Sequence, residues 1–265
     1  MTTDVGAASR CGTPPPRPPV AIISDIHSNL PALLAVLEDI ASRGIGRIVC
    51  LGDVVGYGPD PVACWRLVSE TCETVIRGNH DQALGTGEMS RFHLRAKNAI
   101  DWTRKRILEE KDGEAIIGAI ANLPQSAIDG DFLYVHGSPA GPTMDYLLPG
   151  DSYDRHRMAR EFAGVDAYAF NGHTHIPGVI VRDMRFMPPE ALEGYSARLL
   201  DKRMIVNVGS VGQPRDGNPW SCYVTIEDGA VRYHRVEYDA EEVCDRIMSI
   251  PELDPFLGQR LLAGH

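Results

Sequence analysis

Short continuous apolar runs alternate with segments of helical spacing in the first third of the chain. The first run is Val20–Ile23. Apolar residues then recur at helical intervals before Gly44, at Leu30, Leu33, Leu34, Leu37 and Ile40. The unit repeats with a strand at Arg47–Leu51, a helix at Pro61–Ser69 and a strand at Thr74–Ile76. Continuous apolar strands that alternate with helices predict parallel β-α-β units.

The rest of the chain has more strands than helices. Helical spacing covers Arg91–Glu110 and Glu114–Ala121. A hairpin is expected between Ser126–Ile128 and Phe132–Val135. Further strands are expected at Tyr168–Phe170, Val179–Arg182, Met204–Val208, Ser221–Ile226 and Val231–Val236. The last helices are expected at Glu241–Ile250 and Pro255–Leu262.

The pattern predicts one mixed α/β (α+β) domain over residues 20–265. Residues 1–19 are rich in Gly, Thr and Pro and end in Pro14-Pro15-Pro16-Arg17-Pro18-Pro19, so we expect a disordered tail there. We find no internal repeat and no linker after Pro19. A two-layered arrangement within one domain is therefore the simpler prediction.

Composition narrows the functional classes. The 265 residues include 26 Lys and Arg against 36 Asp and Glu, so the formal net charge is −10. Such a chain repels polyanions, which disfavours non-specific nucleic-acid binding. The six cysteines show no C-x-x-C spacing, and the chain shows neither a signal peptide nor an apolar run that spans a membrane. We therefore expect a cytoplasmic protein with no membrane partner, and the sequence leaves its oligomeric state open.

Polar residues that bind metals follow the apolar strands, where open α/β sheets place their ligand crevices. The first strand is followed by Asp25-Ile26-His27 and the second by Gly52-Asp53. Asn79-His80 follows the third. Later strands are followed by His136 and by Gly172-His173-Thr174-His175. The same D-x-H spacing at Asp154-Arg155-His156 lies in a polar helical stretch, so strand context, rather than spacing, identifies the candidates.

Any single histidine here has the alternative of a hydrogen-bonded structural role, but the set as a whole favours metal binding. Clustered carboxylates and imidazoles are unfavourable when buried unless a cation or mutual pairing compensates them. Oxygen and nitrogen ligands without thiolate suit manganese or iron, with zinc as an alternative. The seven candidate ligands exceed the needs of one ion and are Asp25, His27, Asp53, Asn79, His136, His173 and His175. Two ions about 3.5–4 Å apart can hold a hydroxide and clamp a phosphoryl group, which predicts hydrolysis.

The series from Asp25 to His175 resembles the calcineurin-like metallophosphoesterase superfamily in order and approximate spacing. The segment Asn207–Arg215 is similar to the bacterial branch related to diadenosine tetraphosphatases. The resemblance implies a four-layer αββα sandwich of two mixed sheets flanked by helices. It also implies one ion on Asp25, His27 and His175, a second ion on Asn79, His136 and His173, and Asp53 as the bridge.

The same resemblance implies roles in catalysis. His80 matches the histidine that contacts the phosphate and protonates the leaving oxygen, a role suited to an imidazole whose pKa lies near neutral. Arg77 precedes Gly78-Asn79-His80 as in the protein phosphatase branch, and its guanidinium suits phosphate oxygens, as does that of Arg215. A purely structural role is the alternative for both arginines.

One motif departs from the family pattern. Protein Ser/Thr phosphatases and symmetrical dinucleoside tetraphosphatases typically carry G-D-x-V-D-R-G, where this chain has Gly52-Asp53-Val54-Val55-Gly56-Tyr57-Gly58. Gly56 supplies no carboxylate to orient His80, and Tyr57 does not replace an arginine. The departure argues against both activities and leaves the partner of His80 open.

Substrate contacts are suggested by a basic segment in this acidic chain. Between Arg91 and Arg106 the sequence has six cationic residues and one acidic residue, Asp101. We expect Arg91 and Arg95, together with Lys97, to attract a polyphosphate, with a solvated helix face as the alternative. Phe92 and Trp102 have two alternative roles, stacking on a base or packing in the core.

The sequence thus predicts a dimetal-dependent phosphohydrolase with His80 as general acid and a metal-held hydroxide as nucleophile. It cleaves phosphate ester or phosphoanhydride bonds of small phosphorylated metabolites, with nucleotides or dinucleoside polyphosphates favoured. A protein Ser/Thr phosphatase is the alternative, and a non-catalytic scaffold with the same fold is a weaker one.

Overall fold

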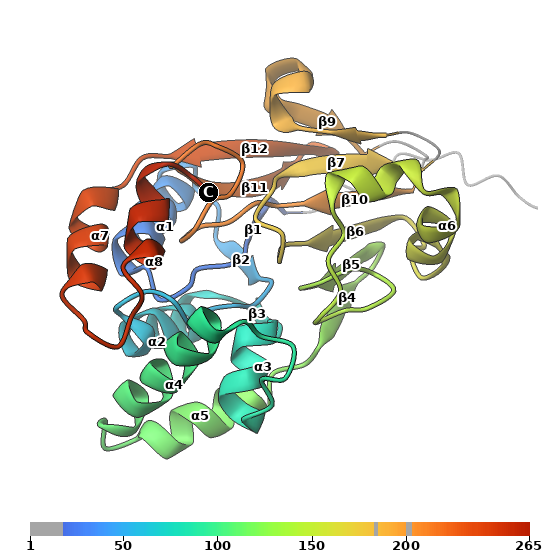
Figure 1. Cartoon of the computed structure of the whole chain (residues 1–265). Helices are drawn as coiled ribbons and strands as arrows, with labels where there is room; N and C mark the ends of the chain where they lie inside the picture. Colours follow the sequence, from blue (N-terminus) through green and yellow to red (C-terminus); the bar gives the residue numbers. More distant parts are fainter. Residues whose placement is uncertain (1–17, 183–184, 200–202) are drawn as a thin grey trace, which may run out of the picture.

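The computed structural model of this chain describes residues 18–182, 185–199 and 203–265. Two six-stranded sheets pack face to face, and helices cover their outer faces (Figure 1). The predicted four-layer sandwich is confirmed. The predicted tail lies, up to residue 17, outside the described residues.

The first sheet combines parallel strands from the start of the chain with antiparallel strands from its end. Its order is β3-β2-β1-β11-β12-β9. Strands β1, β2 and β3 are parallel, and each further neighbour is antiparallel. The strands are β1 (Val20–Ile23), β2 (Arg47–Cys50), β3 (Thr74–Val75), β9 (Ser196–Arg198), β11 (Ser221–Glu227) and β12 (Ala230–Val236).

The second sheet has the order β4-β5-β6-β10-β7-β8. Strands β5, β6 and β10 are parallel in its centre, and the expected hairpin forms β4 and β5. The strands are β4 (Ser126–Asp129), β5 (Phe132–Val135), β6 (Tyr168–Asn171), β7 (Gly178–Val181), β8 (Phe186–Met187) and β10 (Met204–Asn207). The parallel strands of both sheets therefore end at one common edge of the sandwich.

Eight α-helices occur in the described part of the chain. They are α1 (Leu30–Ser42), α2 (Pro61–Thr71), α3 (Asn79–Thr86), α4 (Leu94–Leu108), α5 (Gly113–Ala121), α6 (Arg155–Ala163), α7 (Ala240–Met248) and α8 (Phe256–Gln259). Short 3₁₀ turns lie at Pro149–Tyr153, Pro189–Ala191, Glu193–Tyr195 and Arg260–Leu262. None of the described helices is long and apolar enough to cross a membrane.

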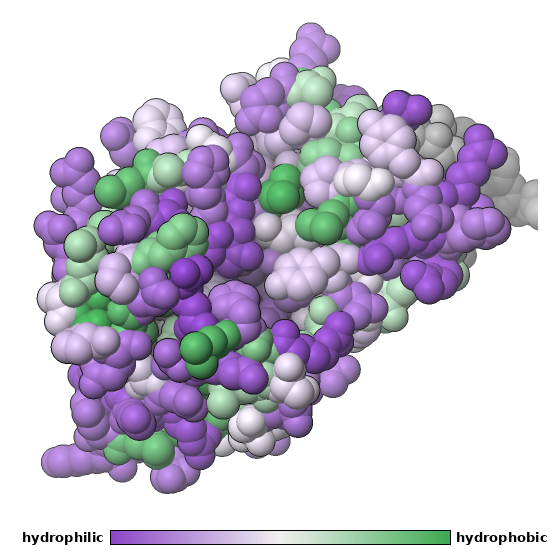
Figure 2. Space-filling model, in the orientation of Figure 1, coloured by the Kyte–Doolittle hydropathy of each residue, from purple (hydrophilic) through white to green (hydrophobic). Residues whose placement is uncertain are grey.

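Alternation along the strands divides the core into layers. Ile22 and Val206 point between the sheets, where they join Phe170 and Tyr134 in a buried cluster. Their neighbour Ile23 points outward, into the cluster formed with α1 and α2. On the far side, the second sheet packs against α6 (Figure 1). The surface seen in Figure 2 is mainly hydrophilic, with apolar side chains in small separate groups.

Several sequence expectations need correction. The helix expected from Arg91 begins at Leu94, and the one expected over Pro255–Leu262 is a four-residue helix followed by a 3₁₀ turn. Helix α3 was not predicted because its sequence, NHDQALGT, has only Ala83 and Leu84 as buried apolar side chains. Strands β8 and β9 were also missed, because two and three residues are too few to show a period.

Candidate metal centre

The seven candidate ligands lie together at the common edge of the two sheets. Asp25 and His27 follow β1, Asp53 follows β2 and Asn79 begins α3. From the second sheet, His136 follows β5, and the two remaining histidines follow β6. The exposed fraction of each ligand is 5% or less: Asp25 0%, His27 2%, Asp53 1%, Asn79 5%, His136 0%, His173 4% and His175 1%.

Five of these residues have a left-handed backbone conformation that non-glycine residues rarely adopt. The φ angles are positive at Asp25 (54°), His27 (50°), Asp53 (51°), His173 (64°) and His175 (60°). Such conformations are unfavourable by about 1–3 kcal/mol each and cluster at functional sites. Backbone hydrogen bonds hold them here, since the amide of Asp25 donates to Gly52 O at 3.0 Å and that of His27 to Asp53 O at 2.9 Å.

One group of ligands forms around Asp25, His27 and His175. The His175 Nε2 atom lies 3.1 Å from Asp25 Oδ1, and it lies 3.2 Å from His27 Nε2. The Asp53 carboxylate approaches the same group, with 3.6 Å between its Oδ2 and His27 Nε2. Four donor atoms thus face one point.

A second group forms around His136. Its Nε2 atom lies 3.0 Å from Asn79 Oδ1, 3.2 Å from His173 Nδ1 and 3.3 Å from Asp53 Oδ2. The same Asp53 oxygen therefore faces both groups. These two sets and the shared carboxylate are the ones that the family resemblance implies, and the structure brings all seven residues together in that arrangement.

Backbone carbonyls orient three of the imidazoles. Nδ1 of His136 lies 2.9 Å from Leu51 O, that of His175 lies 2.5 Å from Gln213 O, and that of His27 lies 3.4 Å from Val55 O. When Nδ1 carries the proton and donates it to the carbonyl, the lone pair of Nε2 points into the cluster. These contacts select the tautomer that a metal requires.

The electrostatics of the cluster favour a cation. Burial lowers the pKa of His27 and His175, and it lowers that of His173 to about 3, so these imidazoles are neutral near pH 7. Although burial opposes the charge, Asp53 and Asp25 raise the pKa of His136 to about 9. Although burial favours the neutral form, His136 keeps the pKa of Asp53 well below its usual value. The carboxylates of Asp25 and Asp53 are therefore both ionised.

The donor set fits divalent metal ions. Asp25 Oδ1 is buried and accepts no hydrogen bond in the described chain, although the His175 Nε2 atom lies 3.1 Å away. Two neutral imidazole nitrogens that face one another at 3.2 Å, as His27 and His175 do, share at most one proton. A pair of divalent cations would satisfy these atoms with carboxylate, amide and imidazole ligands.

His80 lies beside the cluster but makes no polar contact through Nδ1 within the described residues. The rings of Tyr57, His27 and Phe92 surround it, with centroids 4.4, 4.9 and 5.2 Å away. A Cβ on Gly56, whose φ is +96°, would meet Nδ1 at 2.6 Å. The position where the family pattern has a carboxylate thus faces Nδ1, and aromatic packing holds the ring instead.

The pKa of His80 in the folded protein is lower than the near-neutral value expected from the sequence. Burial lowers it to about 4, and the charge of Arg215 contributes in the same direction. The imidazole is therefore neutral near pH 7 in the free protein. It gains a proton readily only when an anion beside it offsets the burial and the arginine charge.

The four predicted arginines have different surroundings. Arg215 lies at the cluster, where its amide donates to His175 O at 3.2 Å and its buried Nε has no partner in the described chain. Arg77 donates from Nη1 to Ala121 O at the end of α5, and its buried Nε has no partner in the described chain. Arg95 pairs with Asp254 at 2.7 Å, and Arg91 lies 3.7 Å from Asp145.

Three further residues at the site were not selected from the sequence. Tyr146 stacks on His173 with ring centroids 3.8 Å apart and is 48% exposed. Tyr57, noted only as a departure, packs between His27 and the apolar side chains of α7 and α8. Arg260 follows α8, and burial together with Arg215 lowers its pKa to about 10. Their positions depend on loops and on the end of the chain, for which the sequence gives no periodic signal.

Comparison with known proteins agrees with this site. Residues 19–229 match the profile of the calcineurin-like phosphoesterase superfamily domain. A crystal structure of a metallophosphoesterase from Sphaerobacter thermophilus is 36% identical, covers 93% of this chain and all of its own, and superposes with a TM-score of 0.79. A hypothetical protein from Pyrococcus horikoshii shares the fold, with a TM-score of 0.71 and 22% identity over 93% of this chain and 98% of its own.

Two curated proteins extend the comparison. An uncharacterized protein of Methanocaldococcus jannaschii is 37% identical over 251 residues, which are 92% of this chain and 98% of that protein. Serine/threonine-protein phosphatase 1 of Salmonella typhimurium is 32% identical over 108 residues, which are 40% of this chain and half of that phosphatase.

Proposed function

Because this chain belongs to the calcineurin-like phosphoesterase superfamily and is a metallophosphoesterase, we propose that it hydrolyses small phosphorylated metabolites at a centre of two divalent ions. Asp25, His27 and His175 would hold one ion, Asn79, His136 and His173 the other, and Asp53 both. Manganese or iron is proposed first, with zinc as the alternative. The main support for this proposal is the position of one oxygen, Asp53 Oδ2. It lies 3.6 Å from His27 Nε2 in one ligand group and 3.3 Å from His136 Nε2 in the other.

The chain's own residues provide binding and proton transfer. When bound, the metal ions supply Lewis-acid stabilisation of the phosphoryl oxygens and activate the attacking water. His80 lies beside the metal ligands and donates a proton to the leaving oxygen. A phosphate dianion bound beside it offsets both burial and the Arg215 charge, so His80 becomes an acid in the substrate complex although its pKa is about 4 in the free protein.

We further propose nucleotides or dinucleoside polyphosphates as substrates. The charge of Arg215 contributes to the lowered pKa of Arg260, so two guanidinium groups lie in the same region, and Arg215 leaves Nε unpaired among the described residues. Two such groups suit a substrate with a phosphate beyond the one that reacts. Tyr146, which stacks on His173, has a half-exposed ring that a base or sugar could contact.

Protein phosphatase activity is the second candidate because of the local similarity to the Salmonella enzyme. That similarity covers 40% of this chain. Gly56 and Tyr57 stand where Ser/Thr phosphatases typically have an aspartate and an arginine, so phosphopeptides are the weaker proposal. A non-catalytic scaffold is weaker again, since all seven ligands and His80 meet at one place.

The test combines metal analysis with hydrolysis. Protein treated with a chelator is reconstituted with Mn²⁺, Fe²⁺ or Zn²⁺, and elemental analysis should find two ions for each chain. Reconstituted protein should then hydrolyse a chromogenic phosphodiester or phosphomonoester. A panel of nucleotides, dinucleoside polyphosphates and phosphopeptides ranks the substrates. Reconstituted protein without turnover on any of them would overturn the proposal.

Asp53→Asn tests the shared carboxylate. We expect it to lose most of its metal and its turnover because both ligand groups lose a charge at once. Asp101→Asn, an exposed carboxylate on α4, is the matched control and should keep both. Wild-type metal content in Asp53→Asn would exclude the bridging role.

A further inference from the structure

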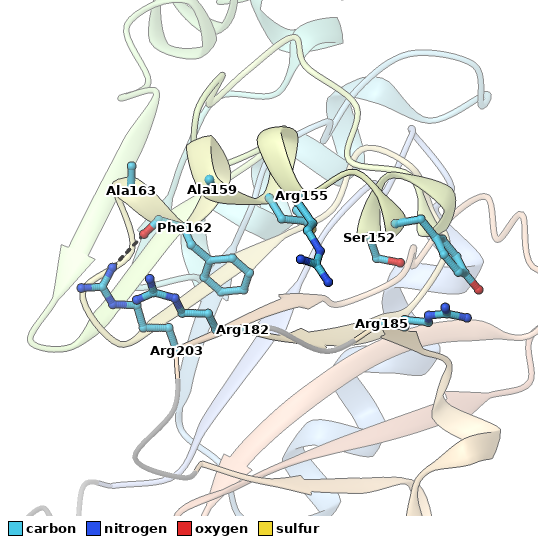
Figure 3. A pocket seen from close by; sticks show the side chains of 10 residues that line it. Ser152, Arg155, Ala159, Phe162, Ala163, Arg182, Arg185 and Arg203 are labelled. Atoms are coloured by element: carbon cyan, nitrogen blue, oxygen red, sulfur yellow. Dashed lines mark hydrogen bonds between the residues drawn. The ribbon is translucent and has the colours of Figure 1, made fainter.

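A cavity lies on the outer face of the second sheet. It is about 550 Å³ in volume, is open to solvent, and is bordered by α6, the 3₁₀ turn before it, the end of β7 and the start of β10 (Figure 3). Four arginines line it: Arg155, Arg182, Arg185 and Arg203. Its size is within the range of about 300–1,000 Å³ that is usual for small-molecule sites.

Strand direction separates this cavity from the candidate metal centre. Strand β10 runs from Met204 toward Asn207, and it is parallel to β6, after which His173 and His175 follow. Arg203 precedes β10 and Arg182 follows its antiparallel neighbour β7, so both lie at the opposite end of the sheet. Their backbones pair there, since the amide of Arg182 donates to Arg203 O at 2.8 Å. A four-residue strand separates the two ends by about 10 Å or more.

The positive charge in this cavity is not neutralised by the described residues. No aspartate or glutamate is among the described residues that line it, although the whole chain carries a net charge of −10. Many other arginines, including the neighbouring Arg157, have a carboxylate within 4 Å. The four lining arginines have none in the described ranges. Arg203 instead donates from Nη1 to Phe162 O at 3.0 Å, as the dashed line in Figure 3 shows.

The remaining walls are suited to a flat or apolar group. Met158 of α6 contributes apolar surface next to the buried Phe162, and Arg185 stacks over the ring of Tyr153 with 4.3 Å between Cζ and the centroid. In Figure 3 the Arg155 side chain extends from α6 into the space between Arg182 and Arg185. Guanidinium groups on one side and apolar surface on the other match a molecule with a charged and an uncharged end.

We propose that this cavity is a second binding site, for a phosphorylated small molecule of the nucleotide type. Its phosphates would contact Arg155, Arg182 and Arg185, and its ring would lie on Met158. Guanidinium groups bind phosphate oxygens through paired, charge-assisted hydrogen bonds, which is why a phosphorylated ligand suits this lining. The proposal does not depend on the reaction at the metal centre.

ADP and pyrophosphate are suitable probes, since pyrophosphate has the charge without the ring. Chelator-treated Asp53→Asn protein is titrated with each, so that the other site has neither its ions nor its shared ligand. Binding is followed through the methyl resonance of ¹³C-labelled Met158, assigned with Met158→Leu. We expect saturable shifts, with ADP binding more tightly than pyrophosphate.

The variants Arg155→Gln and Arg182→Gln, combined in one protein, should weaken ADP binding at least about tenfold, the usual effect of losing charge-assisted hydrogen bonds. Arg160→Gln, on the same helix but outside the cavity, is the matched control and should bind as before. Unshifted Met158, or equal affinity in the double variant, overturns the proposal. Pyrophosphate binding as tight as ADP overturns the part assigned to the ring. Hydrolysis at the metal centre and ADP binding near Met158 are measured separately. Failure of one proposal is therefore distinguishable from failure of the other.

Discussion

The buried carboxylate of Asp81 accepts the backbone N–H of Asp53 at 2.7 Å and so fixes the turn from which the Asp53 side chain reaches both ligand groups. The amides of Gly78 and Val54 donate to the same carboxylate at 3.0 and 3.1 Å. Asp53 in turn accepts the amide of His80 at 2.8 Å. Burial, followed by the charge of Asp53, raises the pKa of Asp81 to about 7. One acidic residue thus connects the turn after β2 with the start of α3.

Replacing Asp81 by asparagine should weaken metal binding without removing a ligand. The amide has one acceptor oxygen where the carboxylate has two, so the turn loses part of its support and Asp53 is held less firmly. We expect metal affinity to fall about 10- to 100-fold, as for other residues that orient ligands. Competition of Mn²⁺ against a fluorescent chelator measures it. Unchanged affinity in Asp81→Asn, next to an unchanged Asp101→Asn control, would show that the turn holds without this carboxylate.

His80→Ala should separate proton transfer from metal binding. The variant keeps all seven ligands, so we expect it to retain its ions while kcat falls about 10²- to 10⁴-fold. The loss should be largest for substrates with alcohol leaving groups and smallest for p-nitrophenyl phosphate, because p-nitrophenolate leaves without a proton. An equal loss on both substrates would contradict the general-acid role and point to phosphate binding alone.

The sequence indicated the metal ligands because they depend on strand ends, which hydrophobic patterning locates. Parallel pairing in register, with Ile23 opposite Cys50, brings Asp25 and Asp53 to the same edge without further information. The contrast with Asp154 and His156 shows why spacing alone was insufficient. There the Asp154 carboxylate accepts the amides of His156 and Arg157 at the start of α6, so the same D-x-H spacing forms a helix cap.

The surroundings of the ligands were not predictable in the same way. Arg77 was expected at the phosphate, but its guanidinium reaches Ala121 O because α5 packs against α3, a helix that the sequence pattern missed. Tyr146 reaches His173 through a loop, and Arg260 reaches the site through the packing of α8 on Tyr57. Contacts of this kind follow from tertiary packing, which leaves no period in the sequence.

Arg260→Gln should affect substrates with more than one phosphate. We expect the KM for ADP or a dinucleoside polyphosphate to rise about tenfold or more, since a charge-assisted contact is lost. The kcat/KM for p-nitrophenyl phosphate should change little, because that substrate has one phosphate. Arg232→Gln, an exposed arginine on β12, provides the control. A parallel loss on both substrates would assign Arg260 to the reacting phosphate or to the fold instead.

His234 should make the stability of the fold depend on pH outside the catalytic site. Its Nε2 atom lies 2.9 Å from Thr225 Oγ1, and its ring stacks on Tyr223 with centroids 4.8 Å apart. Burial, helped by Arg43 and Arg232 and opposed by Asp39, lowers its pKa to about 4. The unfolded chain binds a proton at this histidine below about pH 6.5, whereas the folded chain does so only near pH 4, so stability falls as the pH decreases through this range.

His234→Gln removes this titration. Between pH 7 and pH 4.5, the free energy of unfolding of the wild type should fall by about 1–2 kcal/mol more than that of the variant. Urea unfolding of both chelator-treated proteins at the two pH values measures the difference, and the histidines of the metal centre cancel because both proteins carry them. His156→Gln, an exposed histidine on α6, should show the wild-type dependence. Parallel pH profiles for the wild type and His234→Gln would mean that His234 accepts its proton as easily in the folded chain as in the unfolded one.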